Sequence, residues 1–318
     1  MSDPTLRTIE SNGIRMRIAE QGSGPLVLLL HGFPESWYSW RHQLGALADA
    51  GFRAVAPDQR GYGGTDAPEP IEAYHILELT GDAVGVLDAL GERDAVVVGH
   101  DWGAPVAWHC ALLYPERFRA VVGMSVPYTG RAPAPPIQIM RQIFAGRFFY
   151  MLYFQQPGKA ERELEADVRR TIRSTLYSAS GDAPRESGFA PLPEDAGFLD
   201  QMMDPETLPA WLTEADIEYF AGEFERTGFR GGLNWYRNLD RNWQLTPQLA
   251  GAKIAQPALF IAGDRDVVIS FMQGGIEAMR ALVPNLRGVH LLPGCGHWTQ
   301  QERPADVNRL LLDFLRSL

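Results

Sequence analysis

Asp101 lies in a stretch whose spacing is typical of a nucleophile held at a sharp turn. A β-branched apolar run, Val96 to Val98, ends at Gly99, and an apolar pattern of helical spacing begins after Gly103. Each glycine is two residues from Asp101, and small residues are needed there because bulky side chains do not fit so tight a strand–turn–helix junction. The pattern therefore predicts that the Asp101 carboxylate projects from the end of a strand.

An Asp at such a turn favours chemistry at a saturated carbon. A carboxylate displaces a leaving group there and forms an ester on the enzyme, whereas the Ser that esterases and lipases carry usually attacks a carbonyl. Epoxides and alkyl halides are the substrate classes that fit this attack. The alternative is that Asp101 only caps the helix that follows, a common role of Asp at such a junction.

Two later strand patterns end in candidate partners for Asp101. Asp266 follows the apolar run 258–262, and His297 follows the run 289–292. Because the carboxyl ends of parallel strands share one edge of a sheet, the three loops are expected to converge there. The order nucleophile, acid, histidine is that of the α/β-hydrolase triad.

Other residues compete for the two partner positions. Asp264 is the alternative acid, but Asp266 is preferred because it lies farther along the loop and reaches the histidine better. His297 is preferred among the seven histidines. His31 and His100 end strands and are expected to hydrogen-bond in the floor of the site, and the rest fit structural positions.

The loop His31–Pro34 follows the third predicted strand and is a candidate oxyanion hole. Folds with this triad order place one backbone N–H donor in this loop and a second on the residue after the nucleophile. The expected donors are the amides of Phe33 and Trp102. Pro34 has no N–H and fixes its own φ, so it orients the preceding amide, and a cis Phe33–Pro34 bond fits this role. An ordinary turn is the alternative.

A parallel sheet between two layers of helices is predicted from the alternation of strand and helix patterns. Leu6 to Glu20 alternate around Asn12-Gly13, which predicts an antiparallel hairpin. Continuous apolar runs then alternate with helical patterns, such as the one from Ile76 to Leu90 and the last one from Pro304. The predicted strands are 26–30, 52–56, 96–99, 120–126, 258–262 and 289–292.

Residues 128–250 interrupt this alternation and are predicted to form an inserted helical cap. Prolines break the chain between 133 and 136, aromatic residues cluster, and long strand patterns disappear. We expect helices at Ala160–Tyr177 and at Glu214–Arg226, the second behind the N-cap Thr213, with a mobile Gly- and Pro-rich loop at 180–193. Residues 1–127 and 251–318 then form the core.

The composition narrows the function classes. The 318 residues are 45% hydrophobic, which supports a large buried core, and the net charge of −10 without a Lys/Arg run argues against nucleic acid or anionic membranes as partners. No signal peptide, membrane span, metal site or cofactor is expected, and Cys110 and Cys295 are read as unpaired thiols. We expect a cytoplasmic monomer or homodimer.

The sequence resembles epoxide hydrolases of the α/β-hydrolase fold, both the bacterial enzymes and the hydrolase domain of the mammalian soluble enzyme. The resemblance covers nearly the whole chain. It implies an eight-stranded, mostly parallel sheet with helices on both faces and an inserted helical cap. The motifs that carry it are His31-Gly32-Phe33-Pro34-Glu35-Ser36-Trp37, Gly99-His100-Asp101-Trp102-Gly103, Tyr150-Met151-Leu152-Tyr153-Phe154-Gln155, Asn234-Trp235-Tyr236-Arg237-Asn238 and Cys295-Gly296-His297-Trp298.

The resemblance also implies two tyrosines in the cap that protonate the epoxide oxygen. By motif position these are Tyr150 and Tyr236, with Tyr153 as the alternative to Tyr150. Asp101 would attack an epoxide carbon, and His297, oriented by Asp266, would then activate water against the ester, which gives a vicinal diol. The side chains expected to line a tunnel for a small apolar epoxide are Phe33, Trp37, Trp102, Phe148, Met151, Phe154, Trp235 and Trp298.

Two other functions stay open. A haloalkane dehalogenase shares the fold, the Asp nucleophile and the Trp after it, but it needs N–H donors around a halide. Position 33 here carries Phe, and the predicted cap offers two phenols instead. A hydrolase-like ligand receptor without activity is the other alternative, and it would bind epoxides tightly and form no diol.

Overall fold

Eight strands form one sheet in the residues that the computed structural model describes, which are 3–184, 192–272 and 274–318. Their order is β1-β2-β4-β3-β5-β6-β7-β8, with β2 antiparallel to both neighbours and all other neighbours parallel. The prediction of a mostly parallel sheet with an antiparallel hairpin at its edge is confirmed. The strands are β1 (Thr5–Ser11), β2 (Ile14–Gln21), β3 (Leu26–Leu30), β4 (Arg53–Pro57), β5 (Ala95–His100), β6 (Phe118–Met124), β7 (Ala258–Gly263) and β8 (Leu286–Leu292).

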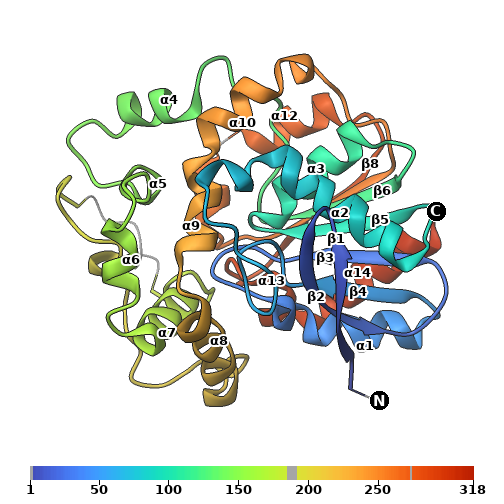
Figure 1. The fold of residues 1–318 in the computed structure, drawn as a ribbon, viewed down its shortest axis with the longest axis horizontal. Coiled ribbons are helices and arrows are strands. Elements are labelled where there is room, and N and C mark those ends of the chain that lie inside the picture. The colour runs from blue at the N-terminus through green and yellow to red at the C-terminus, as the bar shows by residue number, and fades with distance from the viewer. Residues whose placement is uncertain (1–2, 185–191, 273) are drawn as a thin grey trace.

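Helices cover both faces of the sheet (Figure 1). One face packs against α1 and α14, and the other packs against α2 and α3. Leu28 of β3 belongs to the second layer and Leu29 to the first, because successive strand residues point to opposite faces. The helices outside the insertion are α1 (Arg41–Asp49), α2 (Ile76–Leu90), α3 (Gly103–Leu113), α11 (Val267–Phe271), α12 (Gly275–Leu282), α13 (Thr299–Glu302) and α14 (Pro304–Arg316).

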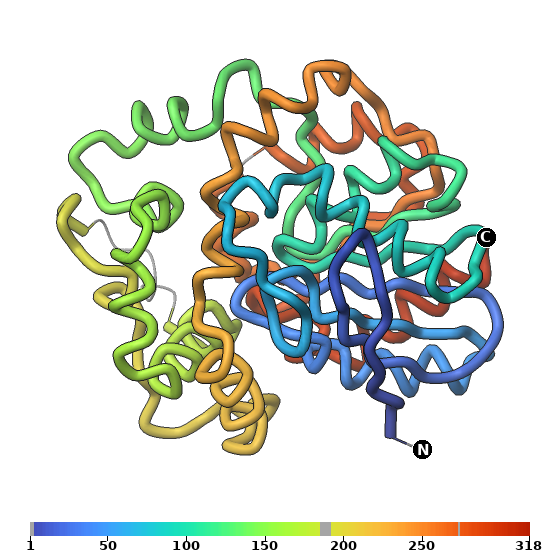
Figure 2. Tube along the Cα trace, viewed as in Figure 1, coloured from blue at the N-terminus to red at the C-terminus, as the bar shows by residue number. Residues whose placement is uncertain are grey.

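The segment between β6 and β7 is helical in the residues described, and Figure 2 shows it, from green to orange, beside the sheet and its helices. We call these elements the cap helices and the rest of the described chain the core. The cap helices are α4 (Pro136–Ile143), α5 (Tyr150–Tyr153), α6 (Lys159–Leu164), α7 (Val168–Ser178), α8 (Glu214–Thr227), α9 (Arg230–Arg237) and α10 (Leu239–Leu245).

Some predicted boundaries were wrong. The helix predicted over 160–177 is two helices, α6 and α7, because Asp167 starts a new one by accepting a hydrogen bond from the Arg170 N–H at 2.9 Å. The strand predicted over 120–126 ends at Met124, where Ser125 takes a positive φ of 67°. Half of the loop predicted at 180–193, residues 185–191, lies outside the described residues.

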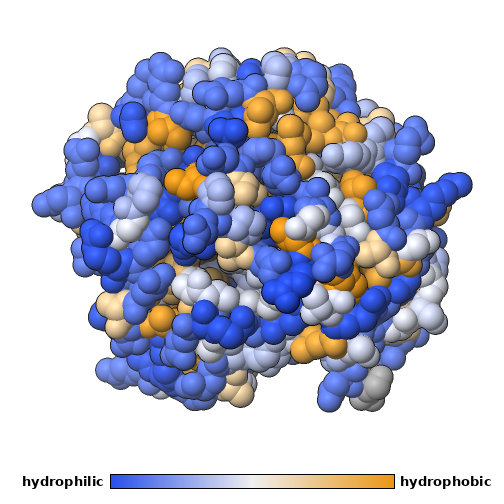
Figure 3. All heavy atoms as spheres, in the orientation of Figure 1, coloured by the Kyte–Doolittle hydropathy of each residue, from blue (hydrophilic) through white to orange (hydrophobic). Residues whose placement is uncertain are grey.

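Most large hydrophobic side chains of the described residues are buried. Most of the face seen in Figure 3 is hydrophilic, with hydrophobic side chains in small patches. Within the ranges given above, no helix combines the length and the apolar character that crossing a bilayer requires.

Candidate active site

Asp101 lies on a turn between β5 and α3, as predicted. Its φ is +48°, a left-handed conformation that is uncommon for a residue other than glycine. Close packing around the turn explains both flanking glycines. A Cβ on Gly99 would overlap the Gly103 carbonyl oxygen, and a Cβ on Gly103 would overlap the Leu30 carbonyl oxygen. The backbone thus holds the Asp101 carboxylate above the end of the sheet.

The two oxygens of the Asp101 carboxylate have different partners. The Phe33 N–H donates to Oδ1 at 2.8 Å, and Oδ2 lies 3.4 Å from Nε2 of His297. A Cβ on Gly32 would overlap the Asp101 side chain, so only glycine leaves room for the nucleophile here. The Phe33–Pro34 bond that follows is cis. One carboxylate oxygen is therefore held by the predicted oxyanion loop, and the other faces the histidine.

Asp266, rather than Asp264, is the carboxylate that contacts His297. Nδ1 of His297 lies 3.0 Å from Oδ1 of Asp266, and the Val268 N–H donates to the same oxygen at 2.9 Å. Asp264 instead accepts a hydrogen bond from the Gly294 N–H at 2.8 Å. The predicted acid and histidine thus lie together at the carboxyl edge of the sheet.

The charges around His297 shift the pKa of its imidazole. Burial opposes the charged form, but the Asp266 and Asp101 carboxylates outweigh it and hold the pKa of His297 well above its usual value. Burial likewise opposes ionisation of Asp266, yet the neighbouring His297 lowers the pKa of that carboxyl. Both carboxylates therefore favour the protonated form of His297.

Glu35 and His100 form the floor below the triad. Nδ1 of His100 lies 2.8 Å from a Glu35 carboxylate oxygen, and its Nε2 lies 2.7 Å from the His297 carbonyl oxygen. The Gly32 N–H donates to the same Glu35 oxygen at 2.7 Å. Burial disfavours the charge on Glu35, but His100 overcomes it and lowers the pKa of Glu35 to about 2. His100 was predicted from the sequence to lie in this floor, whereas no role was predicted for Glu35.

Tyr150 and Tyr236 meet over the triad from two different cap helices. Tyr150 begins α5, Tyr236 lies near the end of α9, and their ring centroids are 5.9 Å apart. Burial and the nearby charge of Asp101 raise the pKa of both phenols far above 10. Tyr153 is engaged elsewhere, because its hydroxyl donates to Glu163 at 2.7 Å. Of the two alternatives, it is Tyr150 that faces Tyr236.

Gln155, which the sequence reading did not single out as a site residue, joins the helices that carry these tyrosines. Its side-chain amide donates to the Met151 carbonyl at 2.8 Å and to the Tyr236 carbonyl at 3.0 Å. Arg237 adds a second link, since its guanidinium donates to the Phe154 carbonyl at 3.0 Å and pairs with Glu161 at 2.8 Å. The spacing of the two phenols thus depends on this pair of links.

A mainly apolar cavity connects the triad with the tyrosines. The space between its lining atoms is about 540 Å³, and part of that space is open to solvent. Asp101, His297, Tyr150 and Tyr236 all line it. Three of the eight predicted substrate contacts also line it, namely Phe33, Phe154 and Trp298. Lining residues that the sequence reading missed are Pro34, Thr175, Ala179, Phe198, Met202, Val267 and Val268.

The other five predicted contacts lie outside the lining. Trp37 packs against Tyr38 and Tyr219. Trp235 points away, since its indole N–H donates to the Arg60 carbonyl at 3.1 Å. Trp102 packs edge-on against the ring of Tyr236, with 5.1 Å between the ring centroids. Phe148 and Met151 also pack within the apolar interior. An aromatic residue next to a motif is thus often packing, which sequence alone does not distinguish from a substrate contact.

Neither a metal site nor a disulfide occurs in the described parts of the chain. No group of three or more His, Cys, Asp or Glu side chains is arranged there to hold a metal ion. Cys110 and Cys295 are buried free thiols.

Trp102, whose amide is the second predicted oxyanion donor, is the N-cap of α3. The role of this amide stays a prediction.

The sheet order, the sharp turn that carries Asp101 and the triad are together those of an α/β-hydrolase. A family model of the alpha/beta hydrolase fold matches residues 25–304. The chain is 49% identical to Epoxide hydrolase A of Mycobacterium tuberculosis, an alignment that covers 100% of this chain and 99% of that protein. It is 42% identical to Bifunctional epoxide hydrolase 2 of Mus musculus, over 96% of this chain and 54% of that protein.

The comparison with solved structures also finds epoxide hydrolases. The crystal structure of Epoxide Hydrolase A from Mycobacterium thermoresistibile is 51% identical, with a TM-score of 0.94 and 98% of each chain covered. Within the α/β-hydrolases, the chain therefore belongs to the epoxide hydrolase family. The resemblance seen in the sequence is confirmed, and the protein is a hydrolase.

Proposed function

We propose that this protein hydrolyses epoxides to vicinal diols through an ester formed on Asp101. The observation that carries the proposal is that two phenols, the half-buried Tyr150 and the buried Tyr236, line the same cavity as the Asp101 carboxylate. The raised pKa of both phenols favours their protonated form. Ring opening turns the epoxide oxygen into an alkoxide, and a neutral phenol hydrogen-bonds that oxygen and then donates a proton to it. The names of the relatives support the same substrate class.

In the first step, Oδ2 of Asp101 attacks an epoxide carbon. A carbon–oxygen bond of the ester forms while a ring carbon–oxygen bond breaks, and the released alkoxide takes a proton from one of the two tyrosines. Oδ2 is the attacking oxygen because Oδ1 is held by the Phe33 amide. The product of this step is a hydroxyalkyl ester of Asp101.

In the second step, water attacks Cγ of the ester. Nε2 of His297 accepts one proton of the water, Asp266 stabilises the resulting imidazolium, and the Phe33 amide stabilises the negative charge on Oδ1. The bond between Cγ and Oδ2 then breaks, and the diol leaves with Oδ2 and a proton from His297. The second proton of the water, left on the new carboxyl group, restores the tyrosine.

The proposed substrates are small apolar epoxides, because most of the cavity lining is apolar. Cytoplasmic location and a monomeric or homodimeric state stay predictions from the sequence.

A substrate panel with tyrosine variants tests the proposed function. Terminal, aryl and fatty-acid epoxides are assayed for diol, and simple haloalkanes for halide release. We expect diol from at least one epoxide class and a loss in kcat/KM on the order of 10²-fold for Tyr150→Phe and for Tyr236→Phe. Tyr153→Phe, one helical turn away with its hydroxyl on Glu163, is the matched control and should stay within a few-fold of wild type.

Three outcomes would contradict the proposal. Halide release without diol would favour the dehalogenase alternative, and tight binding of epoxides without turnover would favour a receptor. Full activity of both tyrosine variants would remove the role proposed for the phenols.

A further inference from the structure

Thr175 stands apart from the other residues that line the cavity. Four of the polar lining residues belong to the proposed chemistry, namely Asp101, Tyr150, Tyr236 and His297. Among the described lining residues, Thr175 is the one other with a polar side chain, apart from the Trp298 indole, whose N–H is already paired within the protein. Thr175 therefore adds a residue with a hydroxyl group to an otherwise apolar part of the cavity wall.

The Thr175 hydroxyl has no hydrogen-bond partner among the residues described. The residue is only 6% exposed, and its Oγ is shielded from water. Two other hydroxyls of α7 are paired. The Thr171 hydroxyl donates to the Leu164 carbonyl at 2.9 Å, and the Ser178 Oγ accepts from the Met203 N–H at 2.7 Å. Since a buried hydroxyl without a partner is unfavourable, a ligand atom that pairs with it would be bound more tightly.

Contacts with the triad loop fix the position of this hydroxyl. The Trp298 indole donates to the Leu176 carbonyl at 2.7 Å, and the His297 N–H donates to the Ala179 carbonyl at 2.8 Å. Ala179 also lines the cavity and lies about one helical turn from Thr175 on the same side of the helix, about 6 Å along its axis. The hydroxyl is thus held on a rigid element at a set distance from the catalytic end.

We propose that Thr175 is a polar subsite for an oxygen atom of the substrate, several bonds from the oxirane ring. The substrates favoured by this subsite are epoxides that carry an ether or hydroxyl oxygen within an apolar chain. The Thr hydroxyl donates to such an oxygen, and it accepts from a hydroxyl as well. This inference rests on the proposed function and adds a preference within the epoxide class.

A series of isosteric epoxides tests the subsite. It consists of the unbranched eight-carbon terminal epoxide, which is the parent compound, and the analogues in which a single chain methylene is replaced by an ether oxygen at successive positions. For each analogue, kcat/KM is divided by the value for the parent compound with the same variant, so that a change in activity common to both compounds cancels. The ratios are compared among wild type, Thr175→Val and Thr175→Ser.

In wild type, we expect one oxygen position to be preferred over its neighbours. Thr175→Val should lower the ratio at that position about three- to tenfold, which is the range for a single neutral hydrogen bond, and Thr175→Ser should keep it. Thr171→Val is the matched control, because it removes a hydroxyl from the same helix outside the cavity and should leave the ratio unchanged. Thr175→Ala repeats the comparison if valine is not accommodated.

The subsite is overturned if every oxygen position gives the same ratio in wild type and in Thr175→Val. If no compound gives a diol, the proposed function fails separately. The dissociation constants of the same compounds, measured by calorimetry in the Asp101→Asn background with and without Thr175→Val, then decide the subsite. An oxygen preference in binding that depends on Thr175 supports it, and equal affinities overturn it.

Discussion

His297 faces two carboxylates in the resting protein, and only one of them keeps its charge through the proposed reaction. Asp266 and Asp101 both raise the pKa of His297. Ester formation neutralises Asp101 and so removes one of these two stabilising charges. The pKa of His297 therefore falls when the ester forms, which makes the imidazole a base at the step that needs one.

This change predicts that the two chemical steps differ in their sensitivity to acid. In rapid-mixing experiments, ester hydrolysis should slow by about tenfold per pH unit below the pKa that His297 has in the ester, because the protonated imidazole does not accept a proton. Ester formation does not need a neutral His297, so it should fall less over the same range. His297→Gln should accumulate the ester, seen as a mass increase of one substrate molecule. Hydrolysis that is independent of pH, or full turnover by His297→Gln, would contradict this account.

At this scale, the triad could be predicted and its surroundings could not. Asp101, Asp266 and His297 follow strand patterns directly, so their convergence is a consequence of parallel strands. The choice between Tyr150 and Tyr153 depends on a contact with Glu163, ten residues away, which no local pattern reveals. The same holds for Gln155, whose partner Tyr236 lies in another cap helix.

The turn between β5 and α3 depends on backbone contacts that leave no room for a side chain. A Cβ on Gly103 would meet the Leu30 carbonyl of β3, a neighbour that a side chain cannot displace without moving the strand. Gly222 of α8 is the opposite case, because it is exposed and a Cβ there would meet nothing within 4 Å.

These two glycines predict stability changes of opposite sign. Gly103→Ala should lower the free energy of unfolding by about 3 kcal/mol or more and reduce activity with it, because the overlap must be relieved by backbone movement. Gly222→Ala should raise it by about 0.5–1 kcal/mol, because alanine favours the helix and costs less chain entropy. Urea unfolding measures both. A Gly103→Ala protein as stable and active as wild type would contradict the packing described for the turn.

The elements themselves were largely predictable, and their ends were not. Both faces of the sheet are covered, so strands such as β3 are buried along their whole length and read as continuous apolar runs. The region 160–177 has a helical pattern throughout, and only the side chain of Asp167 divides it into α6 and α7. A single hydrogen bond of this kind competes with helix propensity and is not visible in periodicity.

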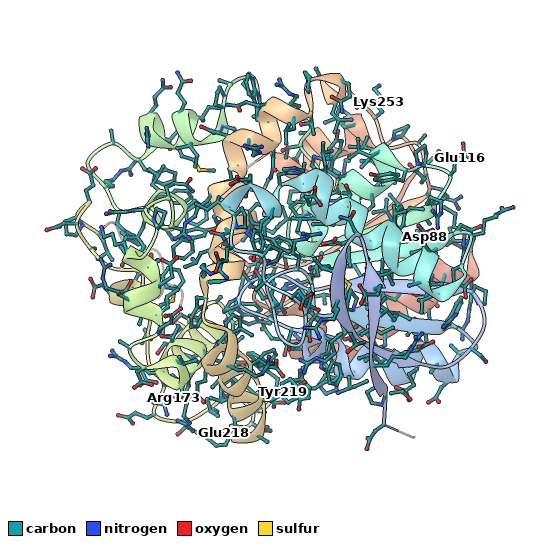
Figure 4. The ribbon with its side chains drawn as sticks, viewed as in Figure 1. Asp88, Glu116, Arg173, Glu218, Tyr219 and Lys253 are labelled. Atoms are coloured by element: carbon teal, nitrogen blue, oxygen red, sulfur yellow. The ribbon has the colours of Figure 1, made fainter. Side chains whose placement is uncertain are left out.

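Helix α8 is one of the cap helices that are fastened to the core. Arg17 of β2 pairs with Asp58 of the core at 2.5 Å and with Glu223 of α8 at 2.9 Å. Tyr219 of α8, labelled in Figure 4, stacks on Tyr38 of the core with 4.1 Å between the rings. Since the cavity is lined by both parts, such attachments help to hold the cap helices in place over the triad.

A double-mutant cycle measures how much this attachment stabilises the molecule. We expect Arg17→Ala and Glu223→Ala to be coupled by about 1 kcal/mol in urea unfolding, because the pair is mostly shielded from solvent. The matched control is Arg169 with Glu218, a pair on the exposed surface of the cap helices, where the coupling should be smaller. Equal couplings for the two pairs would show that α8 is held in another way.

At the scale of the whole molecule, the sequence predicted a core with a helical insertion but not the shape of the cavity. The lining comes from the Phe33–Pro34 turn, the triad loops and several separate cap segments. Thr175 and Met202 lie in parts of the cap where no motif marks them. Their position at the cavity depends on how the cap packs on the core, and that packing is set by long-range contacts such as that of Trp298 with Leu176.

The most direct test of the central claim is a single turnover in water enriched in oxygen-18, with the enzyme in excess over an epoxide that it converts. If Asp101 forms the ester, the new hydroxyl of the diol carries ordinary oxygen from the carboxylate, and mass spectrometry finds the heavy isotope in the peptide that contains Asp101. If water attacks the epoxide directly, the diol carries the heavy isotope and that peptide stays unlabelled, which would contradict the mechanism.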